Sequence, residues 1–394
     1  MARRWQCFEP NLAADPLRIP ISLYVHLPWC ERKCPYCDFN SHEQLNPEDE
    51  APYIDALLED LRIQRPAALN RELASIFIGG GTPSLFSGDS VARLLAGIDE
   101  IWGISHNTEI TLEANPGSSE VEKFRAYKLA GVTRLSIGVQ SFDDTHLSAL
   151  GRIHRAADAR SAASAAAQIF ADWNIDLMHG LPGQTPEQAL ADLTEGIALC
   201  GHHLSWYQLT IEPNTRFWSN PPLLPEEDDL SNIQDAGASL LVALGMEQYE
   251  VSAWAAKGRL SRHNMNYWQF GDYMGIGAGA HGKITTHAAE VIRTQRSRLP
   301  KDYVANVKSG AMPTTREIPP EELPAEFMMN ALRLRDGVDT QLFTERTGLP
   351  MSIVADIKAG LCDRQLLIDA PDRFQATDLG YRFLNSVTAA FLAP

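Results

Sequence analysis

Three cysteines lie close together near the start of the chain, with the spacing Cys-x3-Cys-x2-Cys at Cys30, Cys34 and Cys37. Thiolate sulfur is a soft ligand that suits zinc and iron–sulfur clusters. Three thiolates on a four-iron cluster leave one iron open, and an open position is what a catalytic metal site keeps. A structural zinc site usually has four protein ligands, and His26 or His42 could complete one here. The spacing favours a [4Fe–4S] cluster, with a zinc site as the alternative.

The composition indicates an ordinary globular protein of 394 residues, a length that suits two domains. Its 50 acidic and 34 basic residues give a formal net charge of -16, which argues against non-specific binding to nucleic acid. No apolar run approaches the roughly 20 residues that span a bilayer, and the N-terminal residues lack the apolar stretch of a secretory signal. We therefore expect a cytoplasmic protein with reduced thiols, no membrane span and no nucleic-acid partner.

Short runs rich in Ile, Val and Leu alternate with stretches of helical periodicity through the first half of the chain. Six strands are predicted at residues 21–27, 75–78, 108–113, 133–138, 174–178 and 204–211. Helices are predicted between them at residues 52–62, 89–101, 119–129, 156–170 and 186–199. Repeated strand–helix units indicate a parallel sheet with right-handed crossovers. This pattern fits either an open doubly wound sheet or an incomplete barrel.

In either architecture a ligand site is expected at the carboxyl ends of the parallel strands. The cysteine loop follows the first predicted strand, and the Gly79-Gly80-Gly81-Thr82 turn follows the second. Glu113 ends the third strand, while Gln140 and Asp176 stand at the ends of the fourth and fifth. Because the carboxyl ends of parallel strands meet at one edge, the sequence predicts a single site built from these residues.

Several segments together carry a resemblance to a known family. They are Tyr-Val-His-Leu-Pro-Trp-Cys at 24–30, Gly-Gly-Gly-Thr-Pro-Ser at 79–84, Glu-Ala-Asn-Pro at 113–116, Ser-Ile-Gly-Val-Gln-Ser-Phe at 136–142, Asp-Leu-Met-His-Gly-Leu-Pro at 176–182 and His-Asn-Met-Asn-Tyr-Trp at 263–268. The chain resembles the radical S-adenosylmethionine superfamily, in particular its coproporphyrinogen-dehydrogenase-like branch and the heme chaperones within that branch. The resemblance implies an α/β fold, a partial (β/α)6 barrel with a small, mainly helical C-terminal domain. The expected parts are an N-terminal arm at 1–20, the barrel at 21–230, a barrel extension at 231–318 and the helical domain at 319–394.

The resemblance also implies cofactors. Cys30, Cys34 and Cys37 would hold the [4Fe–4S] cluster, and S-adenosylmethionine would chelate the open iron through its amino and carboxylate groups. The positions that match S-adenosylmethionine-binding residues of the family are Tyr24, Tyr36, Gly80, Gly81, Thr82, Glu113, Gln140, Arg152 and Asp176. The cluster would need an electron donor as a partner. No catalytic residue is assigned.

One position separates the two activities that the branch contains. Its coproporphyrinogen dehydrogenases carry a fourth cysteine two residues after the third, where this chain has Phe39. They also have a longer segment before the first strand, where this chain has residues 1–20. Both departures favour a heme chaperone over an oxygen-independent coproporphyrinogen III oxidase, which is the alternative function.

The segment at 263–268 matches the heme-chaperone members of the branch. Histidine is a common axial ligand of heme iron, so His263 is the predicted ligand. Tyr267 and Trp268 are expected to pack on the porphyrin, and His281 is a second candidate ligand. The sequence therefore predicts a protein that binds heme as cargo and transfers it to acceptor proteins.

Overall fold

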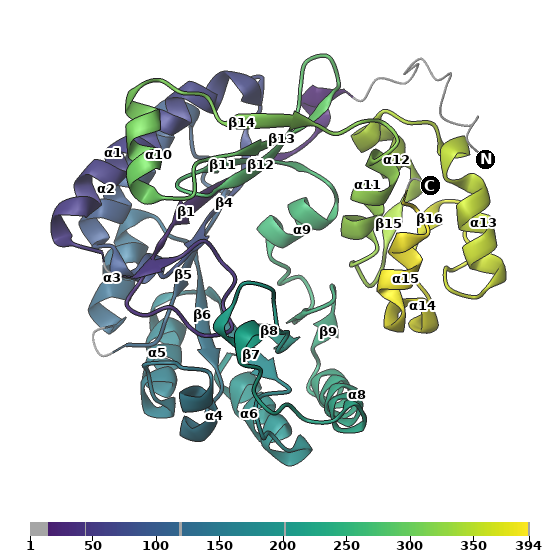
Figure 1. Cartoon of the computed structure of the whole chain (residues 1–394), viewed down its shortest axis with the longest axis horizontal. Helices are drawn as coiled ribbons and strands as arrows, with labels where there is room; N and C mark the ends of the chain where they lie inside the picture. The colour runs from purple at the N-terminus through teal and green to yellow at the C-terminus, as the bar shows by residue number, and fades with distance from the viewer. Residues whose placement is uncertain (1–14, 44, 118–119, 201, 393–394) are drawn as a thin grey trace.

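The centre of the molecule is a curved sheet of twelve strands, with most helices on its convex side (Figure 1). The computed structural model describes residues 15–43, 45–117, 120–200 and 202–392; residues 1–14 of the predicted N-terminal arm lie outside these ranges. The strand order is β14-β13-β12-β11-β1-β4-β5-β6-β7-β8-β10-β9. No helix in the described ranges is long and apolar enough to cross a membrane.

All six predicted strands are present, although the last ends at Gln208 rather than at residue 211, and each pairs in parallel with its neighbour in chain order. They are β1 (Ile21–Leu27), β4 (Leu73–Gly80), β5 (Glu109–Ala114), β6 (Arg134–Gln140), β7 (Asp172–His179) and β8 (His203–Gln208). Their inward and outward side chains are almost all buried, because helices cover one face and the protein interior fills the other. This explains why continuous apolar runs marked them in the sequence.

A seventh parallel strand, β11 (Asp272–Ile276), pairs with β1 on the side away from β4, and no strand was predicted there. Asp272 lies fully buried in this strand and forms ion pairs with Arg71 at 2.7 Å and Lys283 at 2.8 Å. Burial of these charges is tolerated because each is paired and hydrogen-bonded. The network fixes β11 beside β1 and so extends the sheet beyond the six repeated units.

The helices of the repeat cover the convex face of the sheet. They are α1 (Pro47–Gln64), α2 (Gly88–Trp102), α3 (Glu120–Ala130), α4 (Asp144–Ala149), α5 (Ala156–Ile169) and α6 (Pro186–Cys200). The prediction for the first of these began too late, at residue 52. Pro47 starts α1, three acidic residues follow it in the first turn, and Pro52 lies inside the helix. Proline at the first position is favourable because the backbone N–H there has no helical partner.

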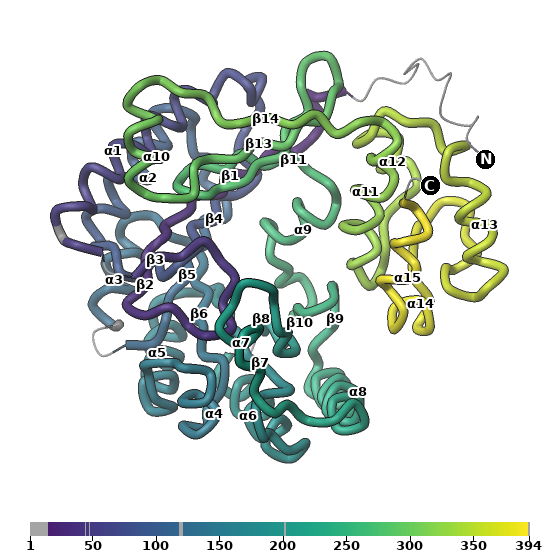
Figure 2. Tube along the Cα trace, viewed as in Figure 1, coloured from purple at the N-terminus to yellow at the C-terminus, as the bar shows by residue number. Residues whose placement is uncertain are grey.

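The remaining strands extend the sheet at its two edges. Antiparallel strands β12 (His281–Thr285), β13 (Val291–Gln295) and β14 (Thr314–Glu317) continue from β11, while β10 (Ala253–Ala255) and β9 (Glu247–Gln248) follow β8. The helices α7 (Arg216–Ser219), α8 (Glu227–Ala243) and α10 (Pro300–Lys308) connect these strands. A short helix, α9 (Arg262–Trp268), lies on the concave side and contacts β1, β4 and β11 (Figure 2).

The C-terminal region packs around a second core centred on Phe327, Phe343 and Phe374. Its elements are α11 (Leu323–Ala331), α12 (Thr340–Thr347), α13 (Ala355–Asp363), α14 (Asp378–Arg382) and α15 (Leu384–Ala389), with a two-stranded sheet of β15 (Val338–Asp339) and β16 (Arg373–Phe374). Phe270 and Val291 of the sheet region contribute to the same core. This core therefore crosses the boundary predicted at residue 318, and the division into domains stays a prediction.

Candidate functional site

The three cysteines of the predicted cluster lie on the loop that follows β1, and each is a partly buried free thiol. The guanidinium Nη1 of Arg152 lies 3.8 Å from the Sγ of Cys34. Its Nη2 donates hydrogen bonds of 2.7 Å to Asn115 Oδ1 and to the carbonyl of Gly138. These partners are neutral, and Nε of Arg152 has no partner in the described part of the chain. A buried positive charge beside the cysteines complements the negative charge of an anionic cluster.

The two histidines of the zinc alternative use ring nitrogens for hydrogen bonds within the protein. His26 Nε2 lies 2.8 Å from the carbonyl of Asn40, and its Nδ1 lies 2.9 Å from the hydroxyl of Tyr24. His42 Nε2 lies 3.2 Å from the carbonyl of Arg298. Among the described residues, no three His, Cys, Asp or Glu side chains are arranged around a single metal ion.

The glycine turn after β4 supports the cysteine loop. The N–H of Gly81 donates to the carbonyl of Leu27 at 2.8 Å, and that of Thr82 donates to the carbonyl of Trp29 at 2.7 Å. A Cβ at Gly81 would lie 2.5 Å from the same carbonyl oxygen of Trp29, so only glycine allows this approach. Gly80 has a φ of +121° and donates its N–H to Glu113 Oε2 at 3.1 Å. The turn thus joins the cysteine loop to the carboxylate that ends β5.

Two carboxyl groups predicted to contact S-adenosylmethionine are buried in the sheet, Glu113 near the end of β5 and Asp176 within β7 rather than at its end. Burial, with a further contribution from the nearby Asp176, raises the pKa of Glu113 to about 8. Burial also raises the pKa of Asp176, although Ser136 and Asn174 donate hydrogen bonds to it at 3.2 and 2.7 Å. A positively charged ligand stabilises the ionised form of buried acidic groups such as these. The sulfonium cofactor predicted from the sequence carries such a charge.

Two other predicted cofactor residues, Gln140 and Tyr36, are also held by contacts within the protein. Gln140 ends β6 with a φ of +69°, and its Oε1 accepts a 2.8 Å hydrogen bond from the hydroxyl of Tyr207. A positive φ at a residue other than glycine is a strained conformation that often marks a functional site. Tyr36 lies beside Cys34 and Arg152, and burial raises the pKa of its hydroxyl.

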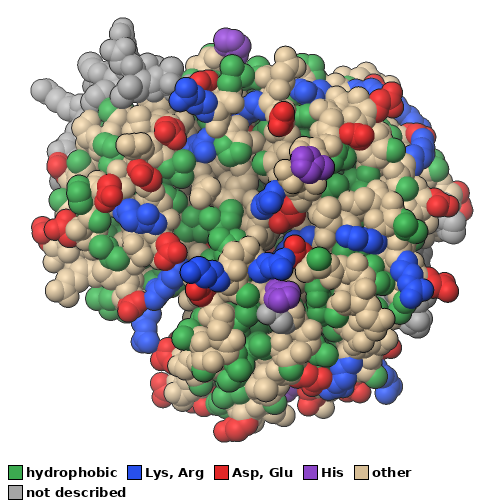
Figure 3. Space-filling model, turned by 180° about the vertical axis from the view of Figure 1, so that it is seen from behind, with side chains coloured by type: hydrophobic (Ala, Val, Ile, Leu, Met, Phe, Trp, Pro, Cys, Tyr) green, Lys and Arg blue, Asp and Glu red, His purple; other side chains and the backbone are tan. Residues whose placement is uncertain are grey.

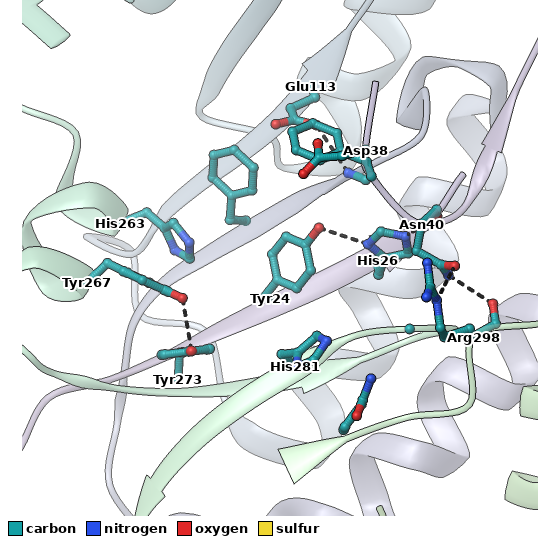
Figure 4. A pocket seen from close by; sticks show the side chains of 15 residues that line it. Tyr24, His26, Asp38, Asn40, Glu113, His263, Tyr267, Tyr273, His281 and Arg298 are labelled. Carbon is teal, nitrogen blue, oxygen red and sulfur yellow. Dashed lines mark hydrogen bonds between the residues drawn. The ribbon is translucent and has the colours of Figure 1, made fainter. Parts of the chain in front are cut away.

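A cavity of about 570 Å³ opens between the cysteine loop, the ends of β1, β4 and β5, and the helix α9 (Figure 4). Cavities of about 300–1,000 Å³ are typical of sites for one small organic ligand. Its walls combine aromatic, histidine and charged side chains. The lining residues are Tyr24, His26, Asp38, Phe39, Asn40, Phe77, Gly80, Glu113, His263, Tyr267, Tyr273, Gly279, His281, Gln295 and Arg298.

The predicted heme residues divide between two environments. His263 and Tyr267 are four residues apart on α9 and both line the cavity. Trp268 does not line it. Its ring packs against the C-terminal core beneath the guanidinium of Arg333, which lies 4.4 Å from the ring centre. The structure thus places two of the three residues at the cavity and the third on the opposite side of α9.

His263 is held in a defined orientation. Its ring stacks on Phe77 with 4.7 Å between the ring centres, and its Nδ1 lies 3.2 Å from the hydroxyl of Ser75. Burial lowers the pKa of His263 to about 3, so its imidazole is neutral at physiological pH. A neutral imidazole whose other nitrogen is hydrogen-bonded is the usual form of a histidine that binds a metal.

The predicted S-adenosylmethionine residues are also distributed over more than one surface. Tyr24, Gly80 and Glu113 line the large cavity, whereas Thr82 and Arg152 line a second cavity of about 400 Å³ next to Cys34. Gln140, Asp176, Tyr36 and Gly81 line neither of these two cavities. The two sets meet at the cysteine loop, which lies between them.

Several cavity residues were not predicted. Phe77 lies in β4, Tyr273 lies in β11, and Arg298 follows β13. Asn40 lies within the cysteine segment, and only its neighbours were given roles. Pairing of β1 with β11 brings Tyr273 to the site, and the antiparallel strands that continue from β11 bring Arg298; that pairing had no clear signal in the sequence.

Two family models match the chain. The model described as Radical SAM superfamily matches residues 24–194, and the one described as HemN C-terminal domain matches residues 318–383. Coproporphyrinogen III oxidase (HemN) from Escherichia coli, a solved structure, has the same fold, with a TM-score of 0.80 at 22% identity over 97% of this chain and 92% of that chain. The solved structure shows a likeness of fold alone. The match to the Radical SAM model defines the class as the radical S-adenosylmethionine superfamily, and membership implies a [4Fe–4S] cluster and S-adenosylmethionine as cofactors.

Curated relatives match almost the whole length of the chain. The protein named heme chaperone HemW from Haemophilus influenzae is 47% identical over 378 residues, which cover 95% of this chain and 98% of the relative. The protein of the same name from Escherichia coli is 45% identical over 375 residues with the same coverage. The chain therefore belongs to the HemW family.

Proposed function

We propose that this protein is a heme chaperone that uses a [4Fe–4S] cluster and S-adenosylmethionine as cofactors and transfers heme to acceptor proteins. The observation that carries the proposal is the cavity of about 570 Å³, which adjoins the cysteine loop and is lined by His263 and Tyr267. The relatives that match over their full length support it, because they are named heme chaperones. Phe39, at the position expected to hold a fourth cysteine in a coproporphyrinogen dehydrogenase, lines the same cavity.

The cofactor site is proposed at the loop after β1 and the adjoining strand ends. Cys30, Cys34 and Cys37 would hold the cluster, with the positive charge of Arg152 beside Cys34. Glu113 and the other family-matched residues would orient S-adenosylmethionine at the open iron. Together the two groups would supply one-electron chemistry, and an electron donor would be a required partner.

The heme site is proposed in the cavity beside it. Ser75 and Phe77 hold the His263 ring so that its second nitrogen is available as an iron ligand. Tyr267 would contact the porphyrin, and its hydroxyl lies 2.9 Å from that of Tyr273. Trp268 would act from the other side of α9, where its packing under Arg333 anchors the helix to the C-terminal core.

Partners of the protein follow from this proposal and from the charge distribution. The partners are heme, heme-acceptor proteins and the electron donor. Acidic and basic side chains are interspersed over the face shown in Figure 3. With the net charge of -16, this distribution supports the proposal that nucleic acid is not a partner.

The experiment that tests the function is anaerobic reconstitution of the full chain, followed by titration with heme and an assay of heme transfer to an apoprotein such as apomyoglobin. We expect a four-iron absorption spectrum, saturable heme binding and transfer. Release of carbon dioxide from coproporphyrinogen III by the same preparation would favour the oxidase-type enzyme instead. Absence of heme binding by the reconstituted protein would overturn the proposal.

A further inference from the structure

The mouth of the large cavity carries a histidine and an arginine that the proposed function does not use. His281 is the first residue of β12, lies exposed at the cavity and has no hydrogen-bond partner for its ring among the described residues. Arg298 lines the same mouth; its guanidinium forms one long hydrogen bond, with Nε 3.4 Å from Asn40 Oδ1, and pairs with no carboxylate in the described ranges. Figure 4 shows His281 and His263 entering from different walls, with Tyr24 between them in this view.

The backbone that carries His281 is held firmly in place. The side-chain amide of Asn40 donates to the carbonyls of Ala278 and Arg298 at 2.9 and 2.8 Å. Gly277, with a φ of +107°, lets the chain approach the carbonyl of His26. The N–H of Arg296 donates to the carbonyl of Ala280 at 2.9 Å. A ligand on a fixed backbone binds a metal with little loss of conformational freedom, so the position suits a specific site rather than a passing contact.

The two side chains suit two different groups of an iron porphyrin, the iron itself and a propionate carboxylate. An imidazole nitrogen is a common axial ligand of heme iron, and a guanidinium pairs well with a carboxylate such as a propionate. Partial burial, followed by the charges of Arg293 and Arg298, lowers the pKa of His281, which favours the neutral ring that can bind iron. The aromatic rings of Tyr24, Phe77 and Tyr273 provide apolar surface between the walls.

We propose that His281 is an iron ligand at the cavity mouth and that Arg298 pairs with a propionate of the bound heme. This inference rests on the proposed function and adds the residues through which heme enters and leaves. His281 is exposed, which permits exchange of the iron to an acceptor, whereas His263 is largely buried and stacks on Phe77 in the cavity wall.

The first test measures heme binding and transfer by the reconstituted full chain and two matched variants. His281→Ala removes the proposed ligand, and His287→Ala removes an exposed histidine of the turn between β12 and β13 that does not line the cavity. We expect His281→Ala to weaken heme binding and speed transfer to apomyoglobin by roughly tenfold or more, as loss of one good ligand does. Added imidazole should restore the wild-type spectrum, and metal-free protoporphyrin IX should bind both variants equally.

The outcomes distinguish failure of the His281 assignment from failure of the proposed heme-chaperone function. If His281→Ala matches His287→Ala in spectrum, affinity and transfer rate while both bind heme, His281 is not a ligand and the proposal is overturned. If the wild-type protein binds no heme, the proposed function itself fails. A His263→Ala variant, measured in parallel, reports on the inner ligand alone.

The second test uses the chemistry of the propionates. Heme and its dimethyl ester, in which both carboxylates are blocked, are titrated into the wild-type protein and the Arg298→Gln variant. We expect the wild type to prefer heme over the ester by roughly tenfold, the range of one charge-assisted hydrogen bond, and the variant to bind the two alike. An equal preference in both proteins would show that Arg298 does not pair with a propionate.

Discussion

Replacing Glu113 by glutamine should remove most of the pH dependence of S-adenosylmethionine binding. Burial, with Asp176 nearby, raises the pKa of Glu113 to about 8, so the ligand-free chain holds this side chain mainly as the neutral acid at pH 7. The carboxylate form interacts more favourably with the amino group and sulfonium of the cofactor, so binding releases a proton. The affinity then rises up to tenfold per pH unit below the pKa, which gives roughly 50-fold between pH 6 and pH 8.

Isothermal titration calorimetry of the reconstituted protein at pH 6, 7 and 8 measures this effect. Buffers with different heats of ionisation, such as phosphate and Tris, report the proton that is released. The α-amino group of the cofactor titrates at about pH 7.7–8.0, so the decisive quantity is the difference between wild type and Glu113→Gln. The glutamine retains an oxygen that can accept the hydrogen bond from the Gly80 N–H. Equal pH slopes in the two proteins would refute the reasoning.

Three further predictions concern the cluster and the fold. Cys34→Ala should abolish the four-iron spectrum after reconstitution, whereas Cys362→Ala, which changes a cysteine far from the loop, should keep it; retention of a full cluster in Cys34→Ala would contradict the ligand assignment. Gly81→Ala should cost about 1–3 kcal/mol of unfolding free energy, because its Cβ would overlap the carbonyl of Trp29. Gly360→Ala, in the open on α13, should instead stabilise by about 0.5–1 kcal/mol, and urea denaturation compares the two. Asp272→Asn should cost about 3–5 kcal/mol in the same assay because it leaves two buried cations without their carboxylate; a loss below about 1 kcal/mol would show that the network contributes little.

The repeated strands could be predicted because a strand that is buried on both faces has a nearly continuous run of apolar residues in the sequence. In β1 nearly every side chain is buried, and the apolar run has the same bounds as the strand. The strand β11 has a fully buried Asp272 and a glycine among five residues, so its sequence lacks that signal. Asp272 is tolerated through Arg71, which lies 201 positions away in the chain. A single sequence does not reveal a pairing over that distance.

The same distinction explains the candidate site. The strand-end residues were predicted because parallel strands bring their carboxyl ends to one edge, and the structure places Gly80 and Glu113 in hydrogen-bond contact there. The cavity mouth could not be predicted as a unit, because it depends on the unpredicted pairing of β1 with β11. The expected contact of Trp268 with the porphyrin fails for a different reason, which is helix geometry. Successive residues of an α-helix point about 100° apart, so Tyr267 and Trp268 cannot both face the cavity that His263 faces.

The cysteine loop links the cofactor site to the proposed heme site through one residue. Asn40 follows the third cysteine by three positions; its carbonyl lies 2.8 Å from His26 Nε2, and its amide holds the carbonyls of Ala278 and Arg298. His26 in turn lies 2.9 Å from the hydroxyl of Tyr24, a residue matched to cofactor binding. These hydrogen bonds connect the cysteine loop directly to the turn that presents His281. In this arrangement a change in the conformation of the cysteine loop would reach the cavity mouth through Asn40, without any chemical step on the heme.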